Sequence, residues 1–340
     1  MAPITIPHHQ LGKNGPMIPA MGFGLMGMSH SYGAIPSDEE RFVLLDRAVE
    51  LGATFWDSSD LYGDNEELLG KWFRRTGKRE EIFLATKFSY VKGGKPLEVD
   101  SSGAYCKRAC AESLRQLGVD YYLHSANPKT PIEETMRALA DLQAEGKIKH
   151  IGLSNVSSTT LRRAYKIAPV AAVQAEYSLF TRDAEGPAGT NLLTTCRELG
   201  VAVVANSPLG RGLITQNFRN GETITDTQDV RSRFMPRFQG DNRERNIQIL
   251  QGFTALAEKK DCTVSQLALA WLLKQGDGVF PIPGTKKLRY LEENWGALGI
   301  SLTDNEEKEI RAFAEMNEMA GPQIPAMFAD HLFRDTVEES

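Results

Sequence analysis

HIGLSN at residues 150–155 and AAVQAE at residues 171–176 are two short apolar runs, separated by a longer stretch with helical spacing. Alternation of this kind predicts a strand, a helix and a second strand. The same rhythm repeats along the chain, and the eight apolar runs are AMGFG (20–24), TFWD (54–57), IFLATK (82–87), DYYLH (120–124), HIGLSN (150–155), AAVQAE (171–176), VAVVANS (201–207) and VFPIPG (279–284). Runs that are apolar along their whole length are typical of strands covered on both faces, and eight of them with intervening helices fit a closed barrel better than an open sheet. We therefore predict an α/β protein with a (β/α)8 TIM barrel.

Helix start and stop signals mark the stretches between these runs. Gly52 and Gly146 stand where helices should end. Three pairs have the spacing of a capping box ahead of a helical stretch: Ser37 with Glu40, Thr130 with Glu133, and Thr263 with Gln266. We find no linker, low-complexity segment or break in composition, so we expect a single domain over residues 1–340. Residues 210–240 form the longest stretch without periodicity, and a loop of that length usually has a task such as closing over a ligand.

The composition disfavours several classes of protein. The 340 residues carry a formal net charge of −5 and no basic run of five or more residues, which argues against a nucleic-acid partner. No stretch approaches the roughly 20 apolar residues of a membrane helix. The amino terminus also lacks a charged start followed by an apolar run, so we expect a cytoplasmic protein with no membrane partner. The four cysteines show no CxxC spacing, so we expect reduced thiols and no metal site.

Gly22, Gly24 and Gly27 spell GxGxxG directly after the first apolar run, a pattern found in open-sheet dinucleotide-binding folds. That motif works when a helix opens at once and aims its amino terminus at a pyrophosphate. Here HSYGAIPS (30–37) precedes the helix that Ser37 caps. We therefore reject the open-sheet interpretation, and expect the glycines to permit a tight turn from strand to loop.

Polar side chains stand at the ends of consecutive predicted strands. Asp57 closes the second, Lys87 the third, His124 the fourth and Asn155 the fifth, while Gln174 falls near the end of the sixth. Taken singly, such residues are more often helix caps or solvated rim charges. In a (β/α)8 barrel, however, functional side chains lie at the carboxyl ends of the strands. Their joint placement therefore indicates a catalytic site.

Tyr62 lies five residues after Asp57, on the loop that faces the same end of the barrel. A phenol with a pKa of about 10 is a poor acid near neutrality and needs a nearby cation to ease the loss of its proton. Lys87 can supply that cation, and Asp57 would keep its ammonium group charged and oriented. His124 could hydrogen-bond a substrate carbonyl and stabilise the negative charge that develops on its oxygen. The set is suited to carbonyl reduction.

Motifs along nearly the whole chain resemble, in order, those of the aldo-keto reductase family. They are FWDSSDLYG (55–63) with NEELLG (65–70), LATKF (84–88), YYLH (121–124) with PIEET (131–135), GKIKHIGLSN (146–155), VQAEYSLFTRD (173–183), SPLGRGLIT (207–215) and IPGTKKLRYLEENWGAL (282–298). The subgroup that includes pyridoxal reductase and perakine reductase is the most similar. The resemblance implies a catalytic tetrad of Asp57, Tyr62, Lys87 and His124, in which Tyr62 is the general acid and a hydride passes directly from nicotinamide C4 to the carbonyl carbon.

The resemblance also implies the remaining features of the prediction. The barrel would carry an N-terminal β-hairpin and an additional C-terminal helix, act on a small-molecule carbonyl substrate and be a monomer or a weak homo-oligomer. NADPH/NADP+ would be the cofactor, because a lysine near its 2′-phosphate favours it over NADH by charge complementarity. The cofactor contacts would be Ser154, Asn155 and Gln174 at the carboxamide; Asn206, Ser207, Leu209, Gly210, Arg211 and Gly212 along the nicotinamide and pyrophosphate; Thr285, Lys286 and Lys287 at the 2′-phosphate; and Glu293 and Asn294 at the adenine.

An ordinary interpretation of Lys286 and Lys287 is a solvated start of a helix. Cations at a helix N-terminus oppose the helix dipole, however, so their presence there calls for an anionic partner. The bound phosphate of the cofactor would be such a partner.

The chain departs from the family pattern at three places. LGVDYYLH (117–124) lacks about four residues that relatives usually have before YYLH, which affects the expected height of His124. Asn206 stands where an aromatic ring usually stacks on the nicotinamide, and losing such a ring forfeits about 1 kcal/mol of contact. Tyr290 stands where many relatives place an arginine at the adenosine end, so Lys286, Lys287 or Arg289 would have to compensate.

One alternative function belongs to a different class of protein. The same barrel serves as a nicotinamide-sensing regulatory subunit in the β-subunits of potassium channels, although we expect no N-terminal extension in this protein for acting on a partner. Such a subunit would bind NADPH with little turnover. The sequence does not identify a substrate, but we expect its pocket to be lined by the loops around 26–32, by Tyr90, by residues after His124, and by Phe328 and Phe333.

Overall fold

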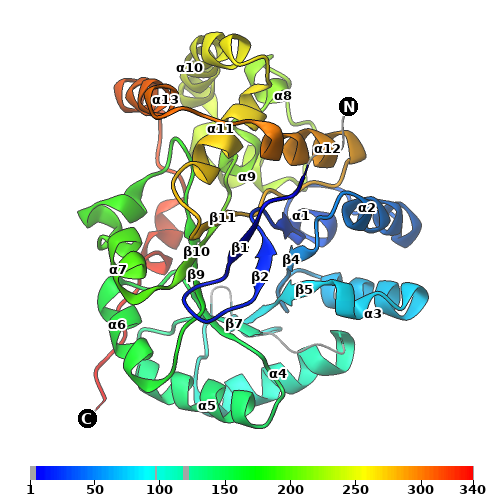
Figure 1. Ribbon diagram of the computed structural model, residues 1–340, viewed down its shortest axis with the longest axis vertical. Helices are drawn as coiled ribbons and strands as arrows, with labels where there is room; N and C mark the ends of the chain where they lie inside the picture. Colours follow the sequence, from blue (N-terminus) through cyan, green and yellow to red (C-terminus); the bar gives the residue numbers. More distant parts are fainter. Residues whose placement is uncertain (1–4, 96–97, 118–121, 340) are drawn as a thin grey trace.

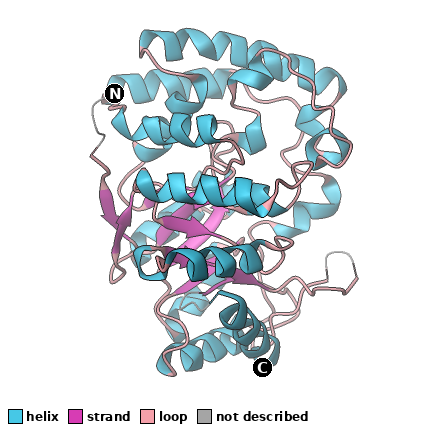
Figure 2. Cartoon of the chain, turned by 90° about the vertical axis from the view of Figure 1, so that its right-hand side faces the viewer, coloured by secondary structure: helices cyan, strands magenta, loops and turns pink. Residues whose placement is uncertain are grey.

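The computed structural model describes residues 5–95, 98–117 and 122–339, without the side chains of residues 122–125. A ring of parallel strands lies at its centre, with helices around it (Figure 1; Figure 2). The strands are β3 (Phe23–Gly24), β4 (Phe55–Asp57), β5 (Phe83–Ala85), β6 (Lys87–Phe88), β7 (Tyr122–Ser125), β8 (Ile151–Ser154), β9 (Ala172–Glu176), β10 (Ala202–Asn206) and β11 (Val279–Pro281). Each of the eight predicted runs overlaps a strand, and the third run includes β5 and the first residue of β6.

The strands pair in chain order, as a barrel requires. β3, β4 and β5 form one parallel set, and β6 to β11 form another, with Thr86 alone separating β5 from β6. The ring closes between β3 and the segment after β11, where Gly24 bridges Gly284 in parallel. The Gly22 N–H also donates to the carbonyl oxygen of Pro281 at 2.9 Å. The predicted (β/α)8 barrel is therefore confirmed.

The glycines of the GxGxxG pattern serve this closure. A Cβ atom on Gly22 would lie 2.5 Å from the Phe55 ring, and one on Gly24 would lie 2.7 Å from the Ile282 carbonyl oxygen. Neither Gly22 nor Gly24 has a positive φ. The expectation that they permit a tight turn was wrong, because what they permit is close approach of neighbouring strands.

Helices follow the strands and cover the outside of the barrel (Figure 1). The helices that alternate with the strands are α2 (Asp38–Glu50), α3 (Asn65–Thr76), α4 (Gly103–Leu117), α5 (Ile132–Ala144), α6 (Ser158–Ile167), α7 (Leu192–Leu199), α11 (Val264–Leu273) and α12 (Leu288–Gly296). The further helices are α1 (Met26–Ser29), α8 (Gln216–Arg219), α9 (Val230–Phe234), α10 (Gly240–Lys259) and α13 (Asp304–Met316). The predicted additional C-terminal helix is α13, whereas α10 was not predicted.

Two of the three predicted capping boxes form. Ser37 begins α2 and Thr263 begins α11 with reciprocal capping bonds. At α5 the prediction was wrong, because Pro131 occupies the cap position and no side-chain capping bond forms at this described helix end. The backbone N–H of Thr130 instead donates to the Asn127 carbonyl oxygen at 3.1 Å, closing a turn ahead of the helix.

The predicted N-terminal β-hairpin closes one end of the barrel. Its strands β1 (His8–Gln10) and β2 (Met17–Pro19) pair antiparallel. Leu11 and Ile18 are buried in the same apolar cluster as Phe55 and Phe280, which point into the barrel from β4 and β11. The hairpin therefore covers the amino-terminal end of the barrel interior.

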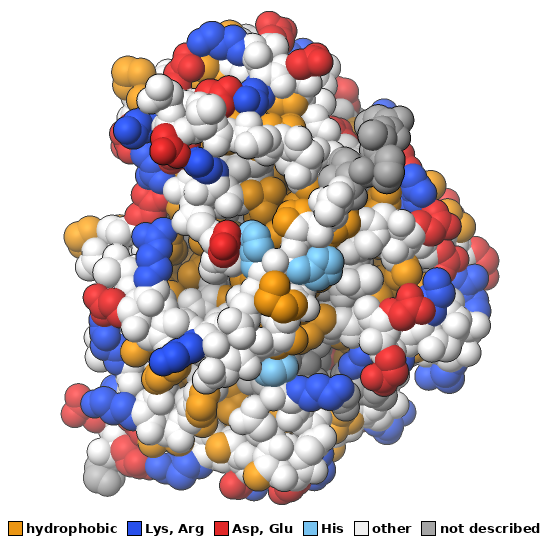
Figure 3. All heavy atoms as spheres, in the orientation of Figure 1, with side chains coloured by type: hydrophobic (Ala, Val, Ile, Leu, Met, Phe, Trp, Pro, Cys, Tyr) orange, Lys and Arg blue, Asp and Glu red, His pale blue; other side chains and the backbone are white. Residues whose placement is uncertain are grey.

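A pocket of about 320 Å³ lies beside this hairpin. Its lining includes His8, Thr54, Phe83 and His150, which precede or begin strands. Figure 3 shows this face of the molecule, with histidine side chains gathered near its centre. The pocket is at the end of the barrel opposite to the predicted catalytic residues, so we do not assign the chemistry to it.

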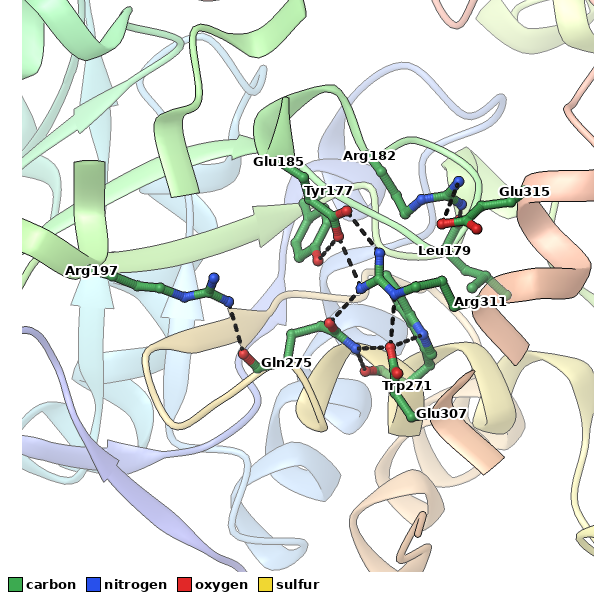
Figure 4. Close-up of polar contacts among 10 residues, drawn as sticks. All are labelled: Tyr177, Leu179, Arg182, Glu185, Arg197, Trp271, Gln275, Glu307, Arg311 and Glu315. Atoms are coloured by element: carbon green, nitrogen blue, oxygen red, sulfur yellow. Dashed lines mark hydrogen bonds and ion pairs between the residues drawn. The ribbon is translucent and has the colours of Figure 1, made fainter. Parts of the chain in front are cut away.

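A polar cluster holds α13 to the rest of the barrel (Figure 4). The Arg311 guanidinium on α13 donates to Glu185 at 2.8 Å and to Glu307 at 3.0 Å. Glu185 also accepts the Tyr177 hydroxyl at 2.6 Å, and Glu307 accepts the Trp271 indole N–H at 3.1 Å. The additional helix thereby fixes the loop that follows β9.

The structure also bears on membrane-spanning helices and on the cysteines. No helix within residues 5–95, 98–117 and 122–339 is both long and apolar enough to cross a bilayer. The four cysteines are free thiols, as predicted.

Candidate active site

Three of the four predicted tetrad residues converge at the carboxyl end of the barrel. Asp57 ends β4, Lys87 begins β6 and Tyr62 lies on the loop after β4. The Lys87 Nζ is 2.5 Å from Asp57 Oδ1 and 3.3 Å from the Tyr62 hydroxyl oxygen. It also donates to the Ser58 carbonyl oxygen at 2.6 Å. The ammonium group therefore sits between the carboxylate and the phenol.

The short loop SSDLYG places Tyr62. The Tyr62 N–H donates to the Ser59 carbonyl oxygen at 3.1 Å, which makes a tight turn. Gly63 follows with a φ of +56°, and a Cβ atom there would lie 2.6 Å from the Ser29 carbonyl oxygen. The Asp60 N–H donates to the Lys87 carbonyl oxygen at 3.0 Å, so the turn is tied to the strand that carries the lysine. Only glycine fits easily at position 63, and the turn depends on it.

Burial and charge set the protonation states of these three groups. Burial raises the pKa of the Tyr62 phenol, and the positive charge of Lys87 opposes that rise. Burial alone would lower the pKa of Lys87, but the charges of Asp57 and Tyr62 outweigh it, so that the pKa is raised. Burial also raises the pKa of Asp57, against the effect of Lys87 and Gln174. At neutral pH the site therefore offers a protonated phenol next to a charged ammonium group, which is an acid with a built-in stabiliser for its conjugate base.

The fourth tetrad residue, His124, lies in β7. Its backbone pairs with Phe88 on one side and Leu153 on the other. Its neighbour Leu123 is level with Lys87, so the His124 backbone is one residue further toward the carboxyl end. The His124 side chain lies outside what the structure describes, as do residues 118–121 of the shortened LGVDYYLH segment. The role of His124 stays a prediction.

The three residues expected at the nicotinamide carboxamide lie together. Ser154 ends β8 directly opposite Gln174 of β9, and the Asn155 N–H donates to the Gln174 carbonyl oxygen at 2.9 Å. Asn155 has a φ of +54°, a left-handed conformation that asparagine tolerates better than most residues. The Gln174 side chain is directed to the tetrad, where its Nε2 donates to Asp57 Oδ2 at 2.8 Å. This contact was not predicted from the sequence.

The loop after β10 contains the residues expected at the pyrophosphate. Backbone φ is positive at Ser207, Gly210, Arg211 and Gly212, so the chain coils tightly here. The Ser207 hydroxyl donates to Asn206 Oδ1 at 3.3 Å, and the Gly212 N–H donates to the Leu209 carbonyl oxygen at 3.0 Å. Two of these four residues with positive φ are glycines, which adopt this conformation without steric cost, so the local sequence favours the coil.

Arg211 in this loop has an unpredicted partner. Its guanidinium makes two hydrogen bonds, of 2.9 and 2.7 Å, to the carboxylate of Glu176 at the end of β9. Glu176 stands last in the run AAVQAE, two residues after Gln174 and so on the same face of its strand. That spacing was the available signal for a second polar residue at this end of the barrel.

The residues expected at the 2′-phosphate and the adenine lie at and along α12. Lys286 Nζ donates to the carbonyl oxygens of Tyr32 and Ala34 at 2.6 and 2.8 Å, and Lys287 is exposed at the start of the helix. Glu293 accepts the Thr263 hydroxyl at 2.7 Å. The remaining members of the set are Thr285, which accepts the Lys287 N–H at 3.1 Å, and Asn294, which is buried.

Tyr290, the third departure from the family pattern, also lies on α12. Its hydroxyl donates to Asn217 Oδ1 at 2.9 Å, and the Arg289 guanidinium stacks 4.5 Å from the centre of its ring. Arg289 therefore brings a positive charge next to the position where the family usually has an arginine.

The aperiodic stretch 210–240 packs against the loop after β3. Tyr32 and Asp229 form an isolated antiparallel bridge, and the Ala34 N–H donates to Asp226 Oδ2 at 2.7 Å. The Arg231 guanidinium lies 4.8 Å from the centre of the Tyr32 ring. Two loops that are nearly 200 residues apart are thus joined at one rim. Closing over a ligand stays a prediction for this stretch.

Aromatic side chains from two segments that are distant in the sequence meet at Tyr90 and His331. The Tyr90 hydroxyl oxygen is 2.9 Å from His331 Nδ1, and the two rings stack with their centres 5.8 Å apart. Phe328 packs edge-on against His331. Tyr90 and Phe328 were expected near the substrate, and His331 was not. Burial raises the pKa of the Tyr90 phenol, the positive charge of Arg334 opposes that rise, and the charge of Tyr62 adds to it.

The geometry defines a class of protein: a (β/α)8 barrel with a phenol, an ammonium group and a carboxylate in contact at the carboxyl ends of its strands. The profile of the Aldo/keto reductase family matches residues 20–315. The chain belongs to the aldo/keto reductase family, so the resemblance seen in the sequence is confirmed and the protein is an oxidoreductase.

Individual relatives match over almost the full length. Aldo-keto reductase str7 from Strobilurus tenacellus is 46% identical over 96% of this chain and 97% of its own. Aldo-keto reductase yakc, from Schizosaccharomyces pombe and named with NADP(+), is 42% identical over 98% of each chain. Neither match tests the predicted subgroup.

Solved structures of the family share the fold. The glycerol dehydrogenase AKR11B4 from Gluconobacter oxydans gives a TM-score of 0.77 at 27% identity, over 95% of this chain and 98% of that one. The thermostable aldo-keto reductase Tm1743, solved with the inhibitor epalrestat, gives 0.71 at 29% identity, over 91% and 100%.

Proposed function

We propose that this protein is an NADPH-dependent reductase that converts small-molecule aldehydes or ketones to alcohols. The observation that carries the proposal is the position of Lys87 Nζ, which is 2.5 Å from Asp57 Oδ1 and 3.3 Å from the Tyr62 hydroxyl oxygen. A buried phenol held against an ammonium group is suited to donating a proton to a carbonyl oxygen.

The chain's own residues handle the proton. When bound, NADPH supplies the hydride that adds to the carbonyl carbon. Tyr62 gives its proton to the carbonyl oxygen, and Lys87 stabilises the phenolate that remains until solvent reprotonates it. Asp57 keeps Lys87 charged and in place. His124, in the neighbouring β7, is proposed to hydrogen-bond the carbonyl oxygen.

The donors around the tetrad fit the proposed cofactor. Ser154, Asn155 and Gln174 bring neutral hydroxyl and amide groups to the ends of β8 and β9, which suit an amide-bearing ring. Lys287 and Arg289 are exposed cations at the start of α12, and they suit a phosphate. The yakc relative is named for NADP(+), which supports the same cofactor.

Two cations among the proposed cofactor contacts, Lys286 and Arg211, have acceptors of their own in the structure. Lys286 donates hydrogen bonds to the carbonyl oxygens of Tyr32 and Ala34, and Arg211 donates to the carboxylate of Glu176. We propose that Lys287 and Arg289 meet the 2′-phosphate first, and that Lys286 holds the loop after β3 beside it.

A Tyr62→Phe variant tests the proposal. Removing the hydroxyl takes away the acid and leaves the ring, so kcat should fall about 10²- to 10⁴-fold while the Kd for NADPH stays within about threefold. The assay follows NADPH absorbance at 340 nm with a panel of reactive aldehydes, and NADPH fluorescence gives the Kd. Tyr165→Phe is a matched control, because it removes a phenol on the outer helix α6, away from the tetrad, and should retain the full turnover.

Two results would contradict the proposal. One is turnover that persists in Tyr62→Phe at the level of the unmodified protein. The other is tight NADPH binding by the unmodified protein with negligible turnover of every aldehyde, which would favour the regulatory-subunit alternative.

A further inference from the structure

The Gln174 side chain bridges two subsites that the proposed function treats separately. It lies on β9 at the position expected to contact the nicotinamide carboxamide, and its Nε2 donates to Asp57 Oδ2 at 2.8 Å. Asp57 lies on β4, which is not a neighbour of β9 in the barrel. The hydrogen bond therefore crosses the barrel interior rather than joining adjacent strands.

This contact completes the set of donors around a buried carboxylate. Asp57 is 2% exposed and Gln174 is 4% exposed, so bulk water is largely excluded from both. Lys87 occupies Oδ1 at 2.5 Å, and Gln174 occupies Oδ2 at 2.8 Å. A carboxylate taken out of water needs such donors to stay ionised. Without Gln174, its second oxygen would lose this donor.

Gln174 can serve both subsites at once. A side-chain amide has two N–H donors and one carbonyl acceptor, and the bond to Asp57 uses one of the donors. The other donor and the acceptor are available for a carboxamide. Ser154 lies directly opposite Gln174 on β8, and the Asn155 N–H donates to its main-chain oxygen at 2.9 Å. The residue is thus fixed on the cofactor side as well.

We propose that Gln174 is a positioning residue that couples the nicotinamide subsite to Asp57, and through Asp57 and Lys87 to the proton on Tyr62. The inference rests on the proposed function for its catalytic consequence, though not for the contact itself. A cofactor carboxamide on Gln174 would fix the amide that holds Asp57, so cofactor binding would order the proton donor. If Gln174 only bound the cofactor, its substitution would change the affinity for NADPH and nothing else.

The first experiment needs neither cofactor nor turnover. In Gln174→Leu the donor is lost at similar side-chain volume, so the pKa of Asp57 should rise further. When the pKa of a carboxyl group is higher in the folded state than in the unfolded state, the protein loses stability as the pH rises above the unfolded pKa of about 4. The midpoint of thermal unfolding of the variant, relative to the unmodified protein, should therefore fall further at pH 7 than at pH 5.

Asn155→Gly is the matched control for this measurement, because glycine removes the side-chain amide and tolerates the φ of +54° at this position. It changes the neighbouring expected carboxamide contact and leaves the bond to Asp57 in place. The midpoint of thermal unfolding of this control should differ from that of the unmodified protein by the same amount at pH 5 and at pH 7. If the change in unfolding midpoint caused by Gln174→Leu is also the same at pH 5 and pH 7, the inference is overturned, whatever the activity of the protein.

The second experiment separates kcat from affinity. At saturating NADPH, kcat of Gln174→Leu should fall about 10- to 100-fold, the loss expected for one hydrogen bond to a charged group. The acid limb of its pH profile should move to higher pH, because Asp57 then protonates earlier. Asn155→Gly should weaken NADPH binding and leave that limb in place. A Gln174→Leu variant with weaker NADPH binding but unchanged kcat and pH profile would overturn the inference.

The two proposals can fail separately. Full turnover in Tyr62→Phe would refute the tetrad, and the unfolding measurement on the cofactor-free protein would still report whether Gln174 holds Asp57. Loss of turnover in Tyr62→Phe together with a pH-independent Gln174→Leu difference would support the tetrad and refute the coupling.

Discussion

At the scale of single residues, a second buried carboxyl group lies next to the tetrad. Asp60 is 7% exposed, and its backbone N–H donates to the Lys87 carbonyl oxygen. Burial, and then the charge of Glu66 on α3, raise the pKa of Asp60 to about 7, against smaller opposing effects of Lys92, Ser59 and Lys87. The folded protein thus holds this proton far more tightly than the unfolded chain does.

We predict that Asp60→Asn gains stability relative to the unmodified protein as pH rises. Between about pH 4 and 7 the folded state binds more protons than the unfolded state, so the unmodified protein loses stability over this window. Asparagine has no such proton to lose. The relative gain should reach at most about 4 kcal/mol and level off above pH 7. Denaturant unfolding followed by tryptophan fluorescence at pH 5, 6, 7 and 8 measures it.

Asp64→Asn is the control with the opposite sign. Hydrogen bonding to Arg41 lowers the pKa of Asp64, so this carboxylate is ionised in both the folded and the unfolded state from pH 5 to 8. Its substitution should cost the same stability at each pH. If the change in free energy of unfolding caused by Asp60→Asn is also constant from pH 5 to 8, Asp60 is ionised in the folded protein over that whole range.

At the scale of helices and strands, the capping residues give a direct comparison. Thr263 accepts the Gln266 N–H at 3.2 Å and donates to Glu293 at 2.7 Å, so it joins the start of α11 to α12. Thr130 has the same sequence signature, but Pro131 takes the cap position of α5. The signature is local, whereas the position of a helix start also depends on the turn before it.

We predict that Thr263→Ala lowers the free energy of unfolding by about 1 to 2 kcal/mol, because a cap and a link between helices are both lost. Thr130→Ala should change it by less than about 0.5 kcal/mol. Urea unfolding of the two variants at one pH provides the comparison. Equal losses in both would mean that Thr130 caps α5 in solution.

At the scale of the whole molecule, the C-terminal segment holds distant elements together. The Arg334 N–H donates to the Asn155 carbonyl oxygen at 2.8 Å, beside the expected carboxamide subsite. Arg163 on α6 donates to the carbonyl oxygens of Thr336 and Val337 at 2.8 and 2.7 Å. The tail thus crosses the barrel rim and is fastened to a helix on the outside.

We predict that Arg163→Met loosens this tail. The amides of Arg334 and Val337 should exchange with solvent several-fold faster, because the anchor that orders them is lost. Hydrogen exchange of the C-terminal peptide, followed by mass spectrometry, measures the rate. Arg162→Met is the control, since Arg162 pairs with Glu198 away from the tail. Unchanged exchange in Arg163→Met would show that the remaining contacts suffice to hold the segment.

The sequence by itself determined the alternation of strands with helices, two of three predicted capping boxes, the strand end at which Asp57 stands, and the position of Lys87 next to the third strand, where it begins β6 rather than closing β5. These features depend on residues at most a few positions apart, since strand and helix periodicity and capping are local. Asp57, Lys87 and Tyr62 were also expected to meet, because strand ends share one rim of a barrel.

Only the tertiary structure decided which side chains touch across that rim. The bond from Gln174 to Asp57 spans 117 residues, and the bonds from Lys286 to the loop after β3 span more than 250. Neither has a local signature, because each depends on where the closed barrel brings two strand ends. The same holds for Gly22 and Gly24, whose spacing resembles a phosphate-binding turn and whose role is to let neighbouring strands approach. Local patterns specify elements, and closure of the barrel specifies their contacts.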